Sequence, residues 1–195
     1  MKFIKKYIND FKINLSLYNL DVIDNLVKNI IKIKKNKGRI FFIGVGGSAG
    51  NASHAVNDFR KLCSIECYNP LDNISEFSAR ANDEGWENTI YPYLKISKLS
   101  KKDCIFIFSV GGGNKKKNVS VNLVKSIDYA KSVNAKVLGI VGKNDGYAAK
   151  NSDCCFILPE TKNKDYITPF SETAQPLIWH LIVSHPNLKD QKTKW

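Results

Sequence analysis

No stretch of the sequence approaches the roughly 20 consecutive apolar residues that a helix needs to cross a bilayer. The opening segment MKFIKKYINDFKINL is basic, but it has neither an unbroken apolar core nor a small-residue cleavage site, so no signal peptide is predicted. Internal repeats, linkers and low-complexity tails are also missing. With 195 residues, 43% of them hydrophobic, the chain is expected to form one cytoplasmic domain with a full core.

Cysteine is scarce and odd in number, which argues against a disulfide framework. The five residues are Cys63, Cys67, Cys104, Cys154 and Cys155. Three of them lie in apolar, strand-like runs, a pattern that indicates reduced thiols in a cytoplasm. Cys63 and Cys67 are four positions apart, but no second Cys/His pair completes a structural zinc site with them.

Acidic residues are few, because 18 Asp and Glu stand against 30 Lys and Arg and leave a net charge of +12. Such an excess can indicate a nucleic-acid partner. The lysines are spread along the chain, however, and no basic motif is interleaved with aromatic residues as in RNA-binding proteins. We therefore predict no nucleic-acid partner and no membrane partner, and we interpret the charge as attraction for an anionic metabolite.

The apolar pattern predicts strands that alternate with helices. Three- to four-residue spacing over 2–36 predicts a helical region that ends at Asn36-Lys37-Gly38. Strands are expected at 39–44, 64–69, 104–108, 136–141 and 154–158, and helices at about 48–62, 73–98 (two short ones), 118–133 and 171–185. This alternation predicts an α/β fold with a doubly wound, flavodoxin-like parallel sheet flanked by helices. Such sheets bind ligands at the carboxyl ends of their strands.

Two of the expected strands end in glycine-rich turns, GVGGSAG (44–50) and SVGGGN (109–114). Free N–H groups at the start of a helix, together with the helix dipole, form an anion site, and hydroxyl or amide side chains can add to it. Candidate phosphate-binding residues are Gly46, Gly47, Ser48, Ser109, Gly111, Gly112, Gly113 and Asn114. The alternative is that both turns are only tight connections. A dinucleotide site is disfavoured because the glycine spacing matches G-x-G-x-x-G only through Gly44-x-Gly46.

Histidine is also scarce, at three residues. His54 and Asp58 share one helix face about 6 Å apart along the axis, which suits two ligands of one divalent ion or a base with its partner. An incidental surface pair is the alternative. His180 lies in an apolar helix, where a histidine is usually a core residue, and Glu172 can be an ordinary first-turn acid. Pro176 should kink this helix or lie near its start.

Together these residues resemble the sugar isomerase (SIS) domain family, and within it the phosphoheptose isomerases. The resemblance rests on Gly46-Gly47-Ser48, the His54/Asp58 helix, ANDEGW (81–86), the strand that ends in Ser109, and the closing helix with His180. It covers roughly residues 14–188. It implies a single SIS domain over 1–195, with an N-terminal helical region (1–37) and an α/β sugar-phosphate-binding core (38–188).

The resemblance implies an aldose–ketose isomerase that converts sedoheptulose 7-phosphate to D-glycero-D-manno-heptose 7-phosphate through an enediol, for heptose biosynthesis of lipopolysaccharide, capsule or other surface glycans. It also implies a cytoplasmic homo-oligomer, with a tetramer expected, and one Zn²⁺ per active site. By the same resemblance, Asp58 and His180 are the acid/base pair, and Asn82 and Asp83 bind the sugar. The implied metal ligands are His54, Asp58, Glu172 and His180.

Several positions depart from the family pattern and indicate a divergent branch. The departures are Val45 for Asn, Asp58 for Glu, Glu172 for Gln, Gly-Gly-Gly for a turn rich in Ser and Thr, and Arg60 two residues before the expected arginine. The alternatives are an isomerase of another sugar phosphate and a sugar-phosphate-binding SIS module without catalysis. One further point stays open: eight residues of straight helix rise about 12 Å, so Glu172 and His180 reach one ion only across a break at Pro176 or between two subunits.

Overall fold

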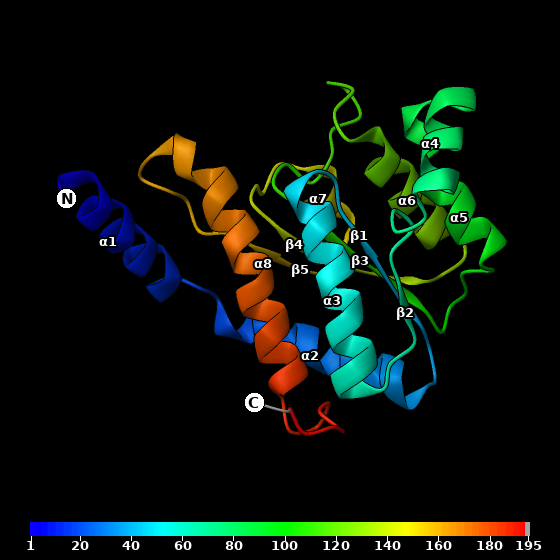
Figure 1. Cartoon of the computed structure of the whole chain (residues 1–195), viewed down its shortest axis with the longest axis horizontal. Coiled ribbons are helices and arrows are strands. Elements are labelled where there is room, and N and C mark those ends of the chain that lie inside the picture. Colours follow the sequence, from blue (N-terminus) through cyan, green and yellow to red (C-terminus); the bar gives the residue numbers. More distant parts are fainter. Residues whose placement is uncertain (194–195) are drawn as a thin grey trace.

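The computed structural model describes residues 1–193 and has a five-stranded, all-parallel sheet at its centre (Figure 1). The strands are β1 (Ile40–Ile43), β2 (Cys67–Tyr68), β3 (Cys104–Ser109), β4 (Lys136–Val141) and β5 (Cys154–Ile157). Their order in the sheet is β2-β1-β3-β4-β5, and every neighbouring pair is parallel. This is the flavodoxin-like order, so the predicted fold class is confirmed.

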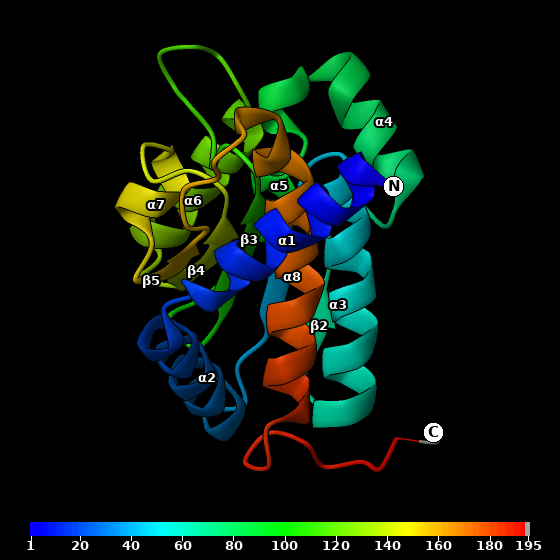
Figure 2. The ribbon, with the colours of Figure 1, turned by 90° about the vertical axis from the view of Figure 1, so that its left-hand side faces the viewer.

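Helices cover both faces of the sheet. They are α1 (Lys2–Ser16), α2 (Leu20–Lys35), α3 (Gly47–Cys63), α4 (Ile74–Asp83), α5 (Tyr91–Ile96), α6 (Val121–Ser132), α7 (Tyr147–Asn151) and α8 (Ile167–Ser184), with 3-10 turns at Trp86–Asn88 and Lys164–Tyr166. Figure 2 shows α3 and α8 side by side, and the two helices are in extensive contact. No helix formed by residues 1–193 is long and apolar enough to span a bilayer.

The core lies in two layers because successive strand side chains point to opposite faces. Ile40 and Phe42 of β1 pack with the buried faces of α2, α3 and α8, whereas Phe41 and Ile43 pack with α5, α6 and α7. All four β1 side chains are fully buried. The continuous apolar runs in the sequence therefore reflect a sheet that is covered on both sides.

The order of the sheet reverses between β1 and β3, and this position determines where ligands meet the fold. From β1 the chain crosses to β2 at one edge, and from β3 it crosses to β4 in the opposite direction. Both glycine turns follow the carboxyl ends of these two adjacent strands. Sheets of this kind bind their ligands at such a reversal point.

Some predicted elements differ from those in the structure. The N-terminal region is two helices, and the Asn19 side chain caps the second by accepting from Val22 N at 3.2 Å. The predicted strand 64–69 contracts to Cys67–Tyr68, and α6 begins only at Val121. The short helix α7 and the 3-10 turn before α8 had no clear sequence signal. All five cysteines are free, and burial raises the pKa of the Cys63 thiol to about 11.

Helix α8 runs through Pro176, so this proline does not mark the helix start. A proline inside a helix leaves the carbonyl four residues earlier without its usual donor. Here that carbonyl belongs to Glu172, and it accepts instead from the Asn51 side chain of α3 at 3.0 Å. The helix is therefore not broken at Pro176, and a hydrogen bond from the neighbouring helix α3 replaces the one that the proline cannot donate.

Candidate active site

The first glycine turn connects β1 to α3 and needs two of its glycines for backbone reasons. Gly46 has φ of 63°, a left-handed value that other residues rarely adopt. A Cβ on Gly44 would lie 2.3 Å from the Ser48 carbonyl oxygen, so α3 begins directly against the end of the strand. The turn thus places the amino end of α3 at the reversal point of the sheet.

Ser48 is buried under this turn, and its hydroxyl oxygen accepts a hydrogen bond from Gln175 Nε2 at 3.0 Å. The Gln175 amide oxygen in turn accepts from Asn51 Nδ2 at 2.7 Å. Two side-chain hydrogen bonds therefore connect α3 to α8. The sequence suggested Ser48 as a phosphate ligand. In the structure its hydroxyl oxygen contacts α8, and its predicted contact with a phosphate stays a prediction.

The second glycine turn is held by hydrogen bonds of its own. Gly112 N donates to the Ser109 hydroxyl oxygen at 2.9 Å, and the carbonyls of Gly112 and Gly113 accept from the first amides of α7. Asn114 pairs with Val119 through two backbone hydrogen bonds, at the base of an exposed lysine-containing loop. At Gly111 the position of an added Cβ is open, with no heavy atom within 4 Å. Hydrogen bonds therefore fix the backbone of Gly112 and Gly113, whereas the space next to Gly111 is open.

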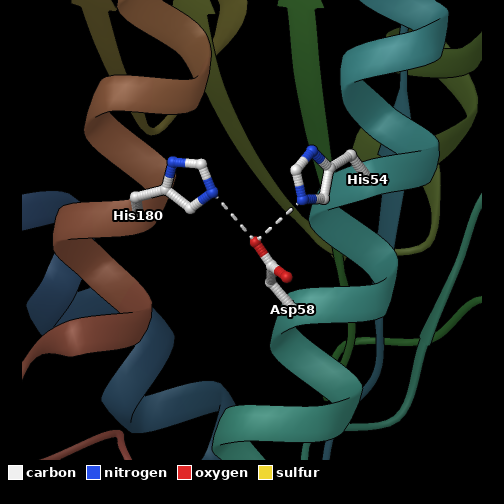
Figure 3. Close-up of side chains that lie close together, drawn as sticks. All are labelled: His54, Asp58 and His180. Atoms are coloured by element: carbon white, nitrogen blue, oxygen red, sulfur yellow. Dashed lines mark ion pairs between the residues drawn. The ribbon is translucent and has the colours of Figure 1, made fainter. Parts of the chain in front are cut away.

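Two turns into α3, three of the predicted site residues meet (Figure 3). Asp58 Oδ2 lies 3.5 Å from His54 Nε2 and 3.2 Å from His180 Nε2. His54 and Asp58 come from one face of α3, and His180 reaches across from α8. Asp58 is buried, whereas both imidazoles are about half exposed. The cluster thus consists of a buried carboxylate and two histidines that lie between it and solvent.

Two further side chains fix the Asp58 carboxylate. The indole N–H of Trp179 donates to Oδ2 at 3.0 Å, and the Asn57 amide donates to Oδ1 at 3.1 Å. Trp179 is fully buried and stacks on Phe108, with ring centroids 5.6 Å apart. Sequence reasoning missed Trp179, because a tryptophan on an apolar helix face is usually a core residue and nothing in the spacing ties it to α3.

The arrangement of the donors fits a divalent ion. Two ligand atoms of a tetrahedral zinc ion lie about 3.3 Å apart when each is about 2.0–2.1 Å from the metal. The two Asp58–histidine distances, 3.5 and 3.2 Å, are close to this spacing. All three donor atoms lie within 4.8 Å of one another, and no other such cluster occurs in residues 1–193. Two histidines and one carboxylate also leave a position for substrate or water, as in catalytic zinc sites.

Glu172, predicted as a fourth metal ligand, does not belong to this cluster. Its carboxylate lies over Gly47, where an added Cβ would be 2.6 Å from Glu172 Oε1. It is therefore at the amino end of α3, next to the first glycine turn. Within this chain Glu172 and His180 therefore do not meet in one cluster, and a role of Glu172 as metal ligand stays a prediction.

The sugar-binding candidates Asn82 and Asp83 end α4, which packs on the 3-10 turn Trp86–Asn88. The Asn82 amide donates to the Asp83 carboxylate at 2.7 Å, and both side chains are exposed. The structure does not bring them into the His54–Asp58–His180 cluster. Their predicted contact with the substrate stays a prediction.

Comparison with solved structures defines the class of fold. A phosphoheptose isomerase from Neisseria gonorrhoeae matches with a TM-score of 0.77 and 17% identity, over 93% of this chain and 94% of that one. A phosphoheptose isomerase from Francisella tularensis matches with the same TM-score and 16% identity, over 93% and 92%. The chain therefore has the α/β fold of these solved phosphoheptose isomerases.

Sequence comparison finds distant relatives, some of them with the same kind of name. The lincomycin biosynthesis protein LmbN of Streptomyces lincolnensis is 32% identical over 157 residues, which are 76% of this chain but only 56% of that protein. Phosphoheptose isomerase 2 of Campylobacter jejuni is 27% identical over 171 residues, which are 84% of this chain and 78% of that one. No protein-family model matches the chain. By sequence and by fold the chain is thus similar to phosphoheptose isomerases, and the low identities mark it as a divergent relative of them.

Proposed function

We propose that this protein is an aldose–ketose isomerase that acts on a phosphorylated sugar, with sedoheptulose 7-phosphate and D-glycero-D-manno-heptose 7-phosphate as the pair to be interconverted for surface-glycan biosynthesis. The observation that carries the proposal is the meeting of Asp58 with two histidines in a chain whose relatives include phosphoheptose isomerases. Such an isomerisation needs a base at a carbon acid and an acid at the neighbouring oxygen. The cluster offers both kinds of group.

In this mechanism Asp58 takes the proton from C1 of the ketose, while His180 donates a proton to O2, which gives the 1,2-enediol. Asp58 then returns its proton to C2, and His180 removes the proton from O1, which gives the aldose. Each residue ends in the state in which it began. Imidazole suits this exchange because its unperturbed pKa is near neutrality.

A divalent ion would be held by His54, Asp58 and His180. With the ion bound through His180 Nε2, the cation would replace the imidazolium proton in polarising the carbonyl and stabilising negative charge on the oxygens of the enediol. Zn²⁺ is the ion that we propose, because two imidazoles and one carboxylate are typical zinc ligands. The phosphate would be held at the glycine turns, Gly46 to Ser48 and Ser109 to Asn114. The sugar would then lie along α3 with its carbonyl end toward Asp58.

The direct test is to incubate the purified protein with sedoheptulose 7-phosphate and to follow the aldose product by NMR, with added Zn²⁺ and with a chelator. We expect conversion with Zn²⁺ and little with chelator. Asp58→Asn should lower kcat by about 100- to 10,000-fold, which is the usual contribution of a general acid or base. The matched control is Asp24→Asn, an exposed residue of α2 paired with Lys28, and it should keep full activity.

Two results would contradict the proposal in different ways. Near-wild-type activity of Asp58→Asn would remove Asp58 from the mechanism. A wild-type protein that converts nothing under either condition would point to another sugar phosphate or to binding without catalysis. Equilibrium binding of sedoheptulose 7-phosphate then separates these two alternatives, because only a binding module holds the compound without turning it over.

A further inference from the structure

Trp179 contacts every member of the His54–Asp58–His180 cluster. Its indole N–H lies 3.0 Å from Asp58 Oδ2, and its ring lies edge-on to His54, with centroids 5.3 Å apart, and tilted against His180 at 5.1 Å. No solvent reaches the side chain. An indole N–H can only donate, so it occupies one lone pair of Oδ2 whatever the protonation state of the histidines.

The direction of this hydrogen bond is fixed by packing. The indole stacks on Phe108 of β3 with an interplanar angle of 18°, and Phe108 is itself fully buried between sheet and helices. Close-packed interiors hold such rings in one orientation. The sheet therefore sets the position of the indole, and the indole sets the position of the Asp58 carboxylate.

The two oxygens of Asp58 consequently have different surroundings. Oδ2 has three nitrogen atoms within 3.5 Å, those of Trp179, His54 and His180. A carboxylate oxygen has two lone pairs, and the indole takes one, so both histidines are left to share the other. The two histidines no longer compete for this lone pair when a cation lies between Oδ2 and the two imidazole nitrogens, because all three atoms then bind the cation. Oδ1 accepts only from the neighbouring Asn57 within the described residues, and it is the oxygen left to take a proton from substrate.

We propose that Trp179 is a positioning residue, which holds Asp58 Oδ2 toward the two histidines so that they can share a divalent cation, and which leaves Oδ1 as the basic oxygen. The inference rests on the proposed function in that Asp58 is both metal ligand and base. It adds a residue that touches neither metal nor substrate. It also explains how the short Asp58 side chain keeps its carboxylate next to the two histidines.

The first test measures Co²⁺ binding by titration with a competing chelator, in the wild type and in Trp179→Phe. Phenylalanine keeps an aromatic ring in the packed position but removes the N–H donor. We expect affinity for Co²⁺ to fall about 10- to 100-fold, the usual effect of removing a partner that orients a metal ligand. The matched control is Trp86→Phe, a partly exposed tryptophan that packs on Phe77, and its Co²⁺ affinity should be unchanged. Wild-type affinity in Trp179→Phe would overturn the proposal, and so would a wild type that binds no Co²⁺.

The second test does not depend on whether Trp179→Phe folds. It follows the indole ¹H–¹⁵N NMR signal of Trp179 in the wild type and in Asp58→Ala. Loss of the carboxylate acceptor should shift this signal upfield, and the indole signal of Trp86 should not move. A Trp179 signal at the same position in both proteins would show that the hydrogen bond is absent in solution and would overturn the proposal. Neither readout requires turnover, so a protein that passes both but converts no sugar phosphate would contradict the proposed function alone.

Discussion

Gly44 and Gly50 belong to the same turn-and-helix segment, but an added methyl group meets different surroundings at each. At Gly44 it would lie 2.3 Å from a backbone oxygen of α3, and that backbone cannot move without shifting the whole helix. Gly44→Ala should therefore lower the free energy of unfolding by roughly 1–3 kcal/mol. At Gly50 nothing lies within 4 Å, and the residue is inside α3. Gly50→Ala should raise the free energy of unfolding by about 0.5–1 kcal/mol. Urea denaturation of both variants checks the prediction, and equal effects would contradict it.

The residues of the site differ in how well the sequence predicts them. His54 and Asp58 meet because helical spacing alone places them on one face. His180 joins them only through the packing of α8 on α3, which periodicity does not determine. For Glu172 the spacing correctly indicated a conflict, since its carboxylate lies at Gly47. Trp179 could not be predicted, because its hydrogen bond joins residues 121 positions apart.

The contact between α3 and α8 depends on Asn51, whose amide donates to the Glu172 carbonyl and to the Gln175 side chain. Asn51→Ala should lower the free energy of unfolding by about 1–3 kcal/mol, because two partly buried acceptors lose their donor. Pro176→Ala should reduce this cost, because an alanine amide at position 176 can donate to the Glu172 carbonyl. A double-mutant cycle by urea denaturation measures the coupling.

The control for this cycle is Asn29→Ala, which removes an exposed hydrogen bond within one turn of α2. Its effect should be small, and it should be the same in the wild-type background and in the Pro176→Ala background. A cycle in which Asn51 and position 176 act additively would mean that the Asn51 amide does not replace the proline's missing donor. The cycle therefore tests whether α3 compensates for the proline in α8.

Elements were predictable where the local pattern is strong. The buried strands β1, β3, β4 and β5 follow from continuous apolar runs bounded by turns. The sequence predicted N-terminal helices over 2–36 but did not place the boundary between α1 and α2, where the Asn19 side chain caps α2. The path of α8 through Pro176 was also not determined by sequence, because it depends on a donor from another helix. The local apolar pattern thus predicted four strands of the sheet, whereas the exact bounds and the course of the helices depend on tertiary contacts.

At the scale of the whole molecule, α1 extends away from the sheet (Figure 1). Several of its apolar side chains are exposed. Tyr7 and Phe11 pack on Phe170, but Phe3, Ile4 and Ile8 on the same helix are exposed. A second exposed apolar group, Leu177 and Leu181, flanks His180 on α8. Apolar surface of this kind marks sites of association with other proteins. The His54–Asp58–His180 cluster therefore borders one of the two apolar surfaces that a homo-oligomer would cover.

The homo-oligomer that the family resemblance implies can be tested through α1. The wild type should have a mass in solution above the 22.0 kDa of one chain, with a tetramer expected, when measured by size-exclusion chromatography with light scattering. Ile4→Lys combined with Ile8→Lys places two charges on the exposed face of α1, and burial of unpaired charge in an interface is unfavourable, so the assembly should dissociate. Ile74→Lys on α4 introduces the same side chain at another exposed isoleucine and should leave the mass unchanged. A wild type that runs as a monomer would contradict the oligomer, and a double variant of wild-type mass would exclude α1 from its interface.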